Sequence, residues 1–353
     1  MKVCIVTVYS SINSGSYWQA KALADYIQNL GHDVYFLERR DPNYTKKQQI
    51  FSIIKKCIKL DFRRAITNYR SYKRFLARQK TFSIIKYSEL KSEKFDCIIL
   101  GSDTIWNLNS KFFTENRDVF WGGIFEEPII TYAASIANTS VETMLKYPEL
   151  KDMVTKWSDI SVRDLATKQA IEKYANKKVY VVADPTLLFP DSYYKCFINI
   201  KRNNKFIFLY LFQALSEKMR KELQSYAKKN SLLIINGVGL SNYCDENIVN
   251  DPYGFINHVV GADLIITDTF HGVVFSTNLH KQFIAINRGK NKVSDFLNSV
   301  GLQNRIVEEN ENICSVLAKP IDYDLVSDAV ERIRERSRSF LKTALGNIYD
   351  KNL

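Results

Sequence analysis

Short apolar runs alternate with amphipathic helical patterns along most of the chain. A first run at residues 2–9 precedes a helical pattern over 17–31, and a second apolar run follows at 33–38. Strands of a parallel sheet are buried on both faces and read as continuous apolar runs, whereas the intervening helices show a period of 3.6 residues. The series therefore predicts strands separated by helices, and it continues with apolar runs at 95–103, 129–135, 159–164 and 178–189.

A second series of the same kind begins near residue 205. Alternation of strands and helices is typical of α/β proteins with parallel sheets. Because the alternation occurs twice, the pattern predicts two Rossmann-like, doubly wound domains. The predicted elements of the second series lie at 205–212, 216–230, 232–239, 251–261, 263–268 and 281–287.

The domain boundaries follow from the same pattern. We place an N-terminal domain at residues 1–190 and a C-terminal domain at 200–320. The join is expected within 190–205, where the periodicity lapses and polar residues cluster. The last segment, 321–353, contains an amphipathic helix that we expect to pack back across the join.

A basic segment interrupts the first series at about residues 42–92 and is predicted to be a helical insertion. Twelve Lys and Arg residues fall within 46–80 against one acid, Asp61, and the formal net charge of the whole chain is +12. Basic amphipathic helices are typical of surfaces that meet anionic lipid, although a helical pair with a solvated basic face explains the pattern equally well. Because no nucleic-acid-binding motif accompanies the charge, we hypothesise contact with an anionic membrane and expect no nucleic-acid partner.

Composition and cysteine usage predict a cytoplasmic protein. No apolar run approaches the roughly 18 residues of a membrane span, and the N-terminal run reads as a strand instead of a signal peptide. The six cysteines are scattered without a C-x-x-C pair, which is typical of reduced thiols. If the basic segment binds lipid, the protein lies peripherally on the inner face of the membrane.

Several common catalytic motifs do not occur in the sequence. There is no G-x-S-x-G, no G-x-x-x-x-G-K-[ST] and no H-E-x-x-H, which disfavours α/β serine hydrolases, P-loop enzymes and zincins. Gly237 and Gly239 follow a predicted strand, but the third glycine of the dinucleotide fingerprint is missing, which disfavours a nicotinamide dehydrogenase. The sequence has no cluster of carboxylates with histidine that would indicate a metal site. We therefore predict neither a bound metal nor a bound cofactor.

The polar residues that follow the predicted strands are the candidate site. Ligands of open parallel sheets bind beyond the carboxyl ends of the strands. His271 is one of only four histidines, and it stands where an apolar strand ends and a helix begins.

Six short motifs at these strand ends resemble the polysaccharide pyruvyl transferase family. They occur in the family's order from residue 13 to about 290, and they read NSGSYWQA, GSDTIWN, YAASI, SVRD, ADPTLLF and TDTFHGVVFS. The resemblance implies a fold similar to the glycosyltransferase B type, with the active site in the cleft between the domains. It also implies transfer of a pyruvyl group from phosphoenolpyruvate to two hydroxyls of a sugar, forming a cyclic ketal. The implied acceptor is a glycan or lipid-linked oligosaccharide of a cell-surface polysaccharide precursor.

Phosphoenolpyruvate carries a carboxylate and a phosphate, so its pocket needs a cation and oriented N–H donors. Arg163 supplies a guanidinium that can grip either anion, and the helix predicted to begin near His271 presents free N–H groups. His271 is the candidate for proton transfer, as acid or as base. Some family members have an arginine two residues before the histidine, whereas this chain has Thr269. The loop at 288–290 is therefore a further candidate for binding the phosphate of the donor. The predicted donor-binding residues are Arg163, Thr269, Phe270, His271, Gly272 and Arg288.

Asp103 is the candidate for binding an acceptor hydroxyl or removing its proton, and a turn or N-cap role is the alternative. Gln19 is expected to face the acceptor sugar, or else to complete a capping box with Ser16. Asp184 is interpreted as mainly structural. The predicted catalytic residues are His271, Arg163 and Asp103, and the predicted acceptor-binding residues are Asn13, Gly15, Gln19, Gly101, Ser102, Asp103 and Ser135.

Two alternative functions stay open on the sequence alone. One is a nucleotide-sugar-dependent glycosyltransferase of the same two-domain fold, which needs a carboxylate for the ribose. Glu246 and Asp251 are weak candidates for that carboxylate. The other alternative is a non-catalytic carbohydrate-binding relative that kept the fold.

Overall fold

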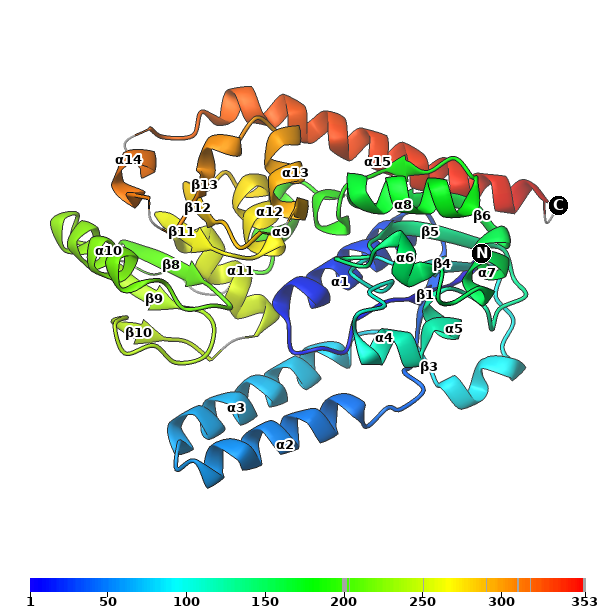
Figure 1. Ribbon diagram of the computed structural model, residues 1–353, viewed down its shortest axis with the longest axis horizontal. Coiled ribbons are helices and arrows are strands. Elements are labelled where there is room, and N and C mark those ends of the chain that lie inside the picture. Colours follow the sequence, from blue (N-terminus) through cyan, green and yellow to red (C-terminus); the bar gives the residue numbers. More distant parts are fainter. Residues whose placement is uncertain are drawn as a thin grey trace.

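The computed structural model describes residues 1–198, 202, 204–249, 251–289, 291–309, 311–317 and 319–351. They form two parallel sheets, one in each half of the chain, with helices packed on their faces (Figure 1). The predicted class, two Rossmann-like α/β units, is confirmed.

The N-terminal sheet has seven strands in the order β3-β2-β1-β4-β5-β6-β7. All of its paired strands are parallel, so their carboxyl ends share one edge. In the register of the central strands, Ile5 lies opposite Phe36 on one side and Ile99 on the other. The strands are β1 (Lys2–Val6), β2 (Asp33–Leu37), β3 (Ile84–Ile85), β4 (Cys97–Leu100), β5 (Ile129–Ala134), β6 (Trp157–Val162) and β7 (Tyr180–Val181).

The C-terminal sheet has six strands in the order β10-β9-β8-β11-β12-β13, again all parallel. Every residue of β8, β11 and β12 is buried, which is why their sequences read as continuous apolar runs. The strands are β8 (Phe206–Tyr210), β9 (Leu233–Asn236), β10 (Glu246–Asn247), β11 (Leu264–Thr267), β12 (Phe283–Ile286) and β13 (Ile306–Val307).

Polar side chains cap the helices that begin at the shared edges. Asn13, Asp164 and Thr269 each accept a hydrogen bond from a backbone N–H in the first turn of the helix that follows. The longer helices are α1 (Ser14–Asn29), α2 (Tyr44–Ile58), α3 (Phe62–Gln79), α8 (Leu165–Ala175), α10 (Glu217–Lys229), α11 (Pro252–Gly261), α12 (Phe270–Asn278), α13 (Asn291–Ser299) and α15 (Tyr323–Lys351).

Shorter helical segments connect these elements. One of them, α9, lies in the predicted join between the domains, and residues 199–201 and 203 of that join are outside the described residues. The short α-helices are α4 (Lys111–Glu115), α5 (Arg117–Phe120), α6 (Val141–Met144), α7 (Glu149–Thr155), α9 (Asp191–Lys195) and α14 (Ile313–Leu317). The 3-10 turns are η1 (Tyr87–Ser92), η2 (Pro185–Leu187) and η3 (Gln303–Arg305).

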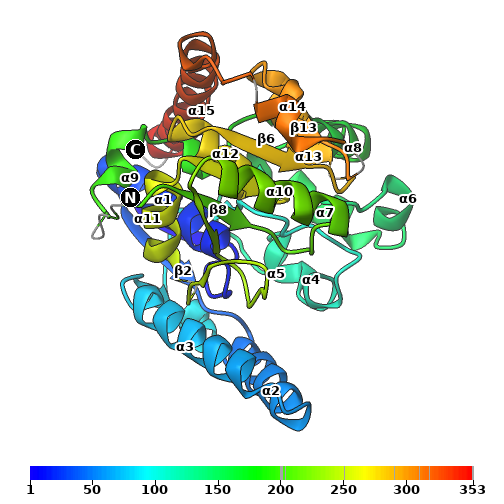
Figure 2. The ribbon, with the colours of Figure 1, turned by 90° about the vertical axis from the view of Figure 1, so that its left-hand side faces the viewer.

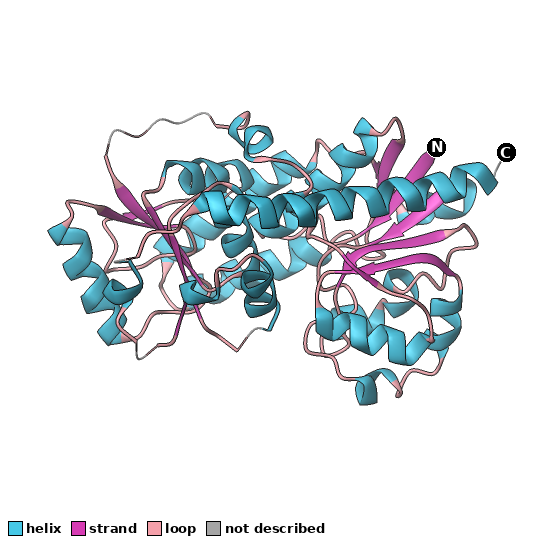
Figure 3. Ribbon diagram, turned by 90° about the horizontal axis from the view of Figure 1, so that it is seen from above, coloured by secondary structure: helices cyan, strands magenta, loops and turns pink. Residues whose placement is uncertain are grey.

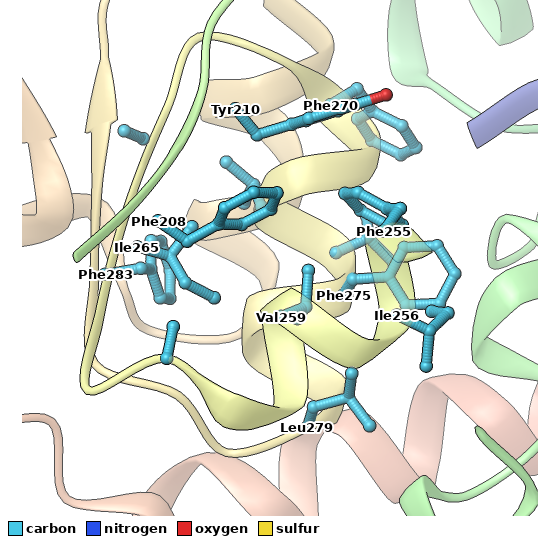
Figure 4. Packing of buried hydrophobic residues seen from close by; sticks show 14 of the residues in the cluster. Phe208, Tyr210, Phe255, Ile256, Val259, Ile265, Phe270, Phe275, Leu279 and Phe283 are labelled. Atoms are coloured by element: carbon cyan, nitrogen blue, oxygen red, sulfur yellow. The ribbon is translucent and has the colours of Figure 1, made fainter. Parts of the chain in front are cut away.

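Aromatic packing fixes α11 and α12 against the C-terminal sheet (Figure 4). The Phe255 ring lies 4.5 Å from the Tyr210 ring and 5.3 Å from the Phe275 ring, measured between centroids. All three residues are almost completely buried. Because β8, α11 and α12 share this cluster, the N-terminal end of α12 has a fixed position at the edge of the sheet.

The two halves are joined by direct contacts and by the last helix. Trp18 of α1 donates a hydrogen bond to the Pro252 carbonyl at 2.7 Å and stacks on Tyr253. Helix α15 runs along both halves (Figure 3). Val330 in its first part belongs to a core cluster shared with the C-terminal sheet, whereas Leu341 packs with the N-terminal sheet.

Helices α2 and α3 form an antiparallel pair that lies to one side of both sheets (Figure 2). Large apolar side chains remain exposed on it, including Phe51 at 70%, Ile58 at 77% and Leu60 at 76%. None of the helices in the described part of the chain is long and apolar enough to cross a membrane.

Candidate active site

A pocket of about 370 Å³ opens between the two halves, beyond the carboxyl ends of the central strands. This volume lies within the range of about 300–1,000 Å³ that is typical of small-molecule sites. Both halves contribute to it. Its lining includes Asn13, Ser16, Asp103 and Thr104 from the N-terminal half, and Tyr210, Phe212, Thr269, Phe270, His271 and Lys292 from the C-terminal half.

His271 reaches this pocket from the first turn of α12. Thr269 caps the helix and accepts a hydrogen bond from the Gly272 N–H at 2.9 Å. Gly272 is one of the predicted donor-binding residues, but a Cβ at this position would lie 2.1 Å from Thr267 Oγ1. Gly272 is thus required by packing inside the C-terminal half, and it does not line the pocket.

Gly15 brings the N-terminal half into contact with the imidazole. A Cβ at this position would lie 2.2 Å from His271 Nδ1, so a side chain cannot be added without moving the ring. Asn13 holds the turn in place because its side-chain oxygen accepts from the Gly15 and Ser16 N–H groups. The N-terminal end of α1 therefore packs directly on the histidine of the other half.

Asp184 holds the opposite side of the imidazole. Its Oδ2 lies 3.6 Å from His271 Nε2 and accepts a hydrogen bond from Arg163 Nη1 at 2.8 Å. Burial by itself raises the pKa of Asp184, but the adjacent His271 ring, and then Arg163, lower it well below the usual range. The sequence interpretation treated Asp184 as mainly structural. Its place just beyond β7, at the same edge as Arg163, was the available signal for a site role.

Arg163 has other partners than the anion we expected. Its side chain is 1% exposed, and its guanidinium lies between Asp184 and Asp103, the latter at 3.8 Å. It also lies 4.6 Å from the Phe270 ring centroid. Arg163 does not line the pocket that contains His271. Its charge is taken up by two carboxylates, so the geometry favours a positioning role.

Asp103 points into the pocket with a positive φ of 79°. Its carboxylate accepts hydrogen bonds from Ser16 Oγ and from the Thr104 N–H, each at 2.8 Å. Burial raises the pKa of Asp103, but Arg163 and then His271 outweigh this effect and lower it. Asp103 is therefore an ionised hydrogen-bond acceptor at the wall of the pocket.

Lys292 is the cation that lines the pocket, and the sequence interpretation missed it. It lies in the first turn of α13, with Nζ 5.8 Å from the Phe270 ring centroid. Arg288, the further cation predicted beside Arg163, instead pairs with Glu309 and lies 3.8 Å from Asp268, in a neighbouring pocket. Lys290 lies outside the described residues. The signal for Lys292 was its place immediately beyond the predicted loop.

Four predicted acceptor residues lie beneath the pocket instead of lining it. Gln19 is fully buried, and its amide donates to the Ser16 and Val8 carbonyls and accepts from Ser102 Oγ. Because these bonds occupy the amide, Gln19 does not line the pocket, and Asn13 caps α1 in place of the expected capping box. The residues in this supporting layer are Gln19, Gly101, Ser102 and Ser135.

Other predicted features can also be placed. Glu246 pairs with Arg202 at 2.9 Å, and Asp251 caps α11 and faces Arg74 at 3.5 Å, so neither carboxylate lines the pocket. Within the described residues, no group of three or more His, Cys, Asp or Glu side chains is arranged to hold a metal ion.

Two parallel α/β sheets with a pocket between their carboxyl edges define the glycosyltransferase B architecture. The chain belongs to the polysaccharide pyruvyl transferase family, because the sequence profile of that family matches residues 13–290. The predicted resemblance is thereby confirmed, and membership assigns the chain to the pyruvyl transferases of polysaccharide biosynthesis. No curated protein sequence matches the chain.

Solved structures with the same architecture cover nearly the whole chain. A Listeria monocytogenes protein described as a UDP-N-acetylglucosamine 2-epimerase has a TM-score of 0.61 at 8% identity, covering 99% of this chain and 97% of that one. The UDP-GlcNAc 2-epimerase from Neisseria meningitidis, bound to UDP-GlcNAc, has 0.51 at 12% identity and coverages of 98% and 94%. UGT89C1 from Arabidopsis thaliana, complexed with UDP, has 0.50 at 12% identity and coverages of 100% and 99%. At these identities the likeness concerns the fold alone.

Proposed function

We propose that the chain transfers the pyruvyl group of phosphoenolpyruvate to two hydroxyls of one sugar in a lipid-linked precursor of a cell-surface polysaccharide. The product is a cyclic ketal, and phosphate is released. The observation that carries this proposal is the meeting of His271, Asp103 and Lys292 in one pocket between the two halves. They supply a proton carrier, an ionised acceptor for a hydroxyl, and a positive charge for the donor.

Lys292 and the first turn of α12 are the proposed contacts of the donor. The first N–H groups of a helix have no partner within the helix, so they favour anions such as carboxylate and phosphate. Phe270 and His271 provide such groups at the pocket, and Lys292 adds a charge beside them. Arg163 acts behind this surface by holding Asp184 and stacking on Phe270.

His271 is the proposed proton carrier in both bond-forming steps. When the first sugar oxygen bonds to C2 of the donor, its proton passes through His271 to the methylene carbon, which becomes a methyl group. The second oxygen then bonds to C2 and the C2–O bond to phosphate breaks, while His271 passes the second hydroxyl proton to the phosphate that leaves. Asp103 accepts a hydrogen bond from the attacking hydroxyl and orients it. Neither step uses a metal or a bound cofactor.

Binding of the donor is the direct test. Isothermal titration calorimetry of the purified protein in EDTA is expected to show binding of phosphoenolpyruvate. Lys292→Gln is expected to raise its Kd by about 10- to 100-fold, the effect of losing a charge-assisted contact. Lys229→Gln, at an exposed position in the last turn of α10, is the matched control. If the protein binds UDP-N-acetylglucosamine and does not bind phosphoenolpyruvate, the result would instead favour the glycosyltransferase alternative.

Gly15→Ala is expected to lower turnover by about 10²-fold, because a misplacement of a catalytic group by about 1 Å has that effect. The new Cβ would overlap the His271 ring. Turnover is measured as phosphate released from phosphoenolpyruvate with a panel of lipid-linked sugars. Gly346→Ala is the control, since a Cβ there meets nothing within 4 Å and the position is inside α15. Equal activity of the two variants would show that the α1 contact does not position the histidine.

We also propose that the pair α2–α3 rests on an anionic membrane. Exposed apolar side chains such as Phe51 and Ile58 lie among its lysines and arginines, the combination that binds lipid headgroups and acyl chains together. Flotation with phosphatidylglycerol vesicles is expected to fail for a Lys55→Glu and Lys56→Glu double variant. A Lys228→Glu and Lys229→Glu variant, altered on α10, should still float. Unchanged flotation of both variants would contradict membrane contact through this pair.

A further inference from the structure

A second and larger pocket, of about 600 Å³, lies beside the first and has no part in the chemistry above. One wall is the beginning of α3, at the end of the α2–α3 pair. The other wall is formed by the loops that follow β8 and β9 in the C-terminal half. We call it the arginine pocket, because its lining includes Arg63, Arg64 and Arg220.

The arginine pocket carries an excess of positive charge. Asp61 is the one acid among its lining residues, and it pairs with Arg64 at 3.1 Å. Arg63 makes no ion pair within the described part of the chain. Arg220 projects from α10 beside Tyr243, and its buried Nε has no hydrogen-bond partner among the described residues. Two guanidinium groups are therefore available to an anion.

The far wall of the pocket is ordered by two asparagines. Asn236 donates to the Val238 carbonyl at 3.0 Å and to Asn247 Oδ1 at 2.9 Å. The same Asn247 oxygen accepts from the Ser241 N–H at 2.7 Å. This network fixes the loop over residues 238–242, so the wall is formed before any ligand binds.

Phe212 lines both pockets and so connects them. Phe212 is 51% exposed, and its ring stands edge-on to the Tyr210 ring, with 5.6 Å between the centroids. The backbone beneath it is held because Asp268 accepts from the Phe212 and Gln213 N–H groups. An exposed aromatic ring on an anchored backbone is a suitable surface for the apolar face of a sugar.

We propose that the arginine pocket binds the diphosphate of the acceptor, while its sugar passes over Phe212 into the pocket of His271 and Asp103. Guanidinium groups form paired hydrogen bonds with phosphate oxygens. Ile58 and Leu60 immediately precede the lining residues of α3 in the sequence, and their side chains are exposed. We therefore expect the lipid tail of the acceptor to extend from the pocket along the α2–α3 pair. The inference rests on the proposed function, since it assigns the anchor of that acceptor.

The test uses inorganic pyrophosphate and calorimetry with the full chain. Arg220→Gln and the double variant Arg63→Gln with Arg64→Gln are each expected to raise the Kd for pyrophosphate at least about tenfold. Arg70→Gln alters α3, the helix of Arg63 and Arg64, at a position outside the pocket, and it should leave the Kd for pyrophosphate unchanged. Lys292→Gln should also leave it unchanged, which separates this site from the donor pocket. Melting curves check that Arg220→Gln is folded, and the double variant alters exposed positions only.

A second arm distinguishes the sources of the anion. In flotation with neutral phosphatidylcholine vesicles that contain farnesyl diphosphate, the wild type should rise with the vesicles. The arginine variants should remain in the unbound fraction. If those variants lose binding to phosphatidylglycerol vesicles but keep pyrophosphate, the arginines serve the membrane surface and the proposal is wrong. If UDP binds and farnesyl diphosphate does not, the pocket holds a nucleotide and the proposal is also wrong.

Phosphoenolpyruvate binding on the same variants separates this inference from the proposed function. It should be unchanged in the arginine variants, because their side chains lie outside the donor pocket. If the wild type binds phosphoenolpyruvate but not pyrophosphate, the diphosphate site is refuted and the proposed function is not. Binding of pyrophosphate at the arginines in a protein that does not bind phosphoenolpyruvate refutes the pyruvyl transfer and leaves the site.

Discussion

Replacing His271 by glutamine is expected to lower turnover by about 10²–10⁴-fold, the range that general acid–base catalysis contributes. Glutamine keeps a polar side chain of similar reach but cannot carry a proton between a hydroxyl and the methylene carbon. Because donor binding is assigned to Lys292 and backbone N–H groups, the Kd of phosphoenolpyruvate should change little. The measurement is kcat from phosphate release, with the Kd determined separately by calorimetry.

The control for this experiment is His32→Gln, which alters a partly exposed histidine beside the chain's N-terminus. It should retain full turnover. A His271→Gln variant that binds donor and acceptor normally and turns over like the wild type would remove His271 from the chemistry. If it loses donor affinity and keeps kcat at saturation, the histidine serves donor binding and not proton transfer.

The fold could be predicted from the sequence because each central strand is buried on both faces. The runs that contain β8 and β11 have no polar residue at their centres. Such continuous apolar runs are typical of strands in a parallel sheet, which are buried on both faces. The predicted strands were longer than the observed ones, since the polar residues at their ends belong to loops. Those same loop residues form the pocket, so Asp103 and His271 could be found from position alone.

Charge partners could not be predicted in the same way. Arg163 and Asp103 both follow strands, but only the fold shows that Asp184 comes within 2.8 Å of the guanidinium and neutralises it. A strand end fixes the edge of the sheet at which a side chain lies, and it leaves open whether that side chain faces solvent or a counter-charge. The contacts of Gln19 could not be predicted for the same reason, because its hydrogen-bond partners come from three separate segments.

The site is assembled from both halves, so its geometry depends on their contact. His271 belongs to α12 of the C-terminal half, whereas Gly15 and Asp184, which hold the two sides of its ring, belong to the N-terminal half. Asn278, at the other end of α12, donates to the carbonyls of Thr186 and Phe189. The segment after β7 therefore holds α12 at both ends, which couples the imidazole to the packing of the two halves.

Asp184→Asn is expected to lower the free energy of unfolding by about 3–5 kcal/mol, the effect of removing one partner from a buried ion pair. The substitution keeps the shape of the side chain but removes the nearest counter-charge of the Arg163 guanidinium, which is 1% exposed and then keeps Asp103 at 3.8 Å as its ion-pair partner. Urea unfolding at pH 7 measures the difference. Glu217→Gln is the control, because it breaks an exposed pair with Lys221 and should have no measurable effect.

The pH dependence of this difference identifies the carboxylate as its source. The pKa of Asp184 is lowered in the folded protein, so ionised Asp184 stabilises the fold above the ordinary aspartate pKa of about 3.9. This contribution is lost as the pH falls below that value towards the folded-state pKa, since the unfolded chain then binds a proton more readily. The stability gap between wild type and Asp184→Asn should therefore narrow as the pH falls from about 5 towards the folded-state pKa of Asp184. Other carboxylates, including Asp103, titrate in both proteins and largely cancel in the difference. A gap that stays constant or widens as the pH falls would mean that Asp184 is not held ionised between Arg163 and His271.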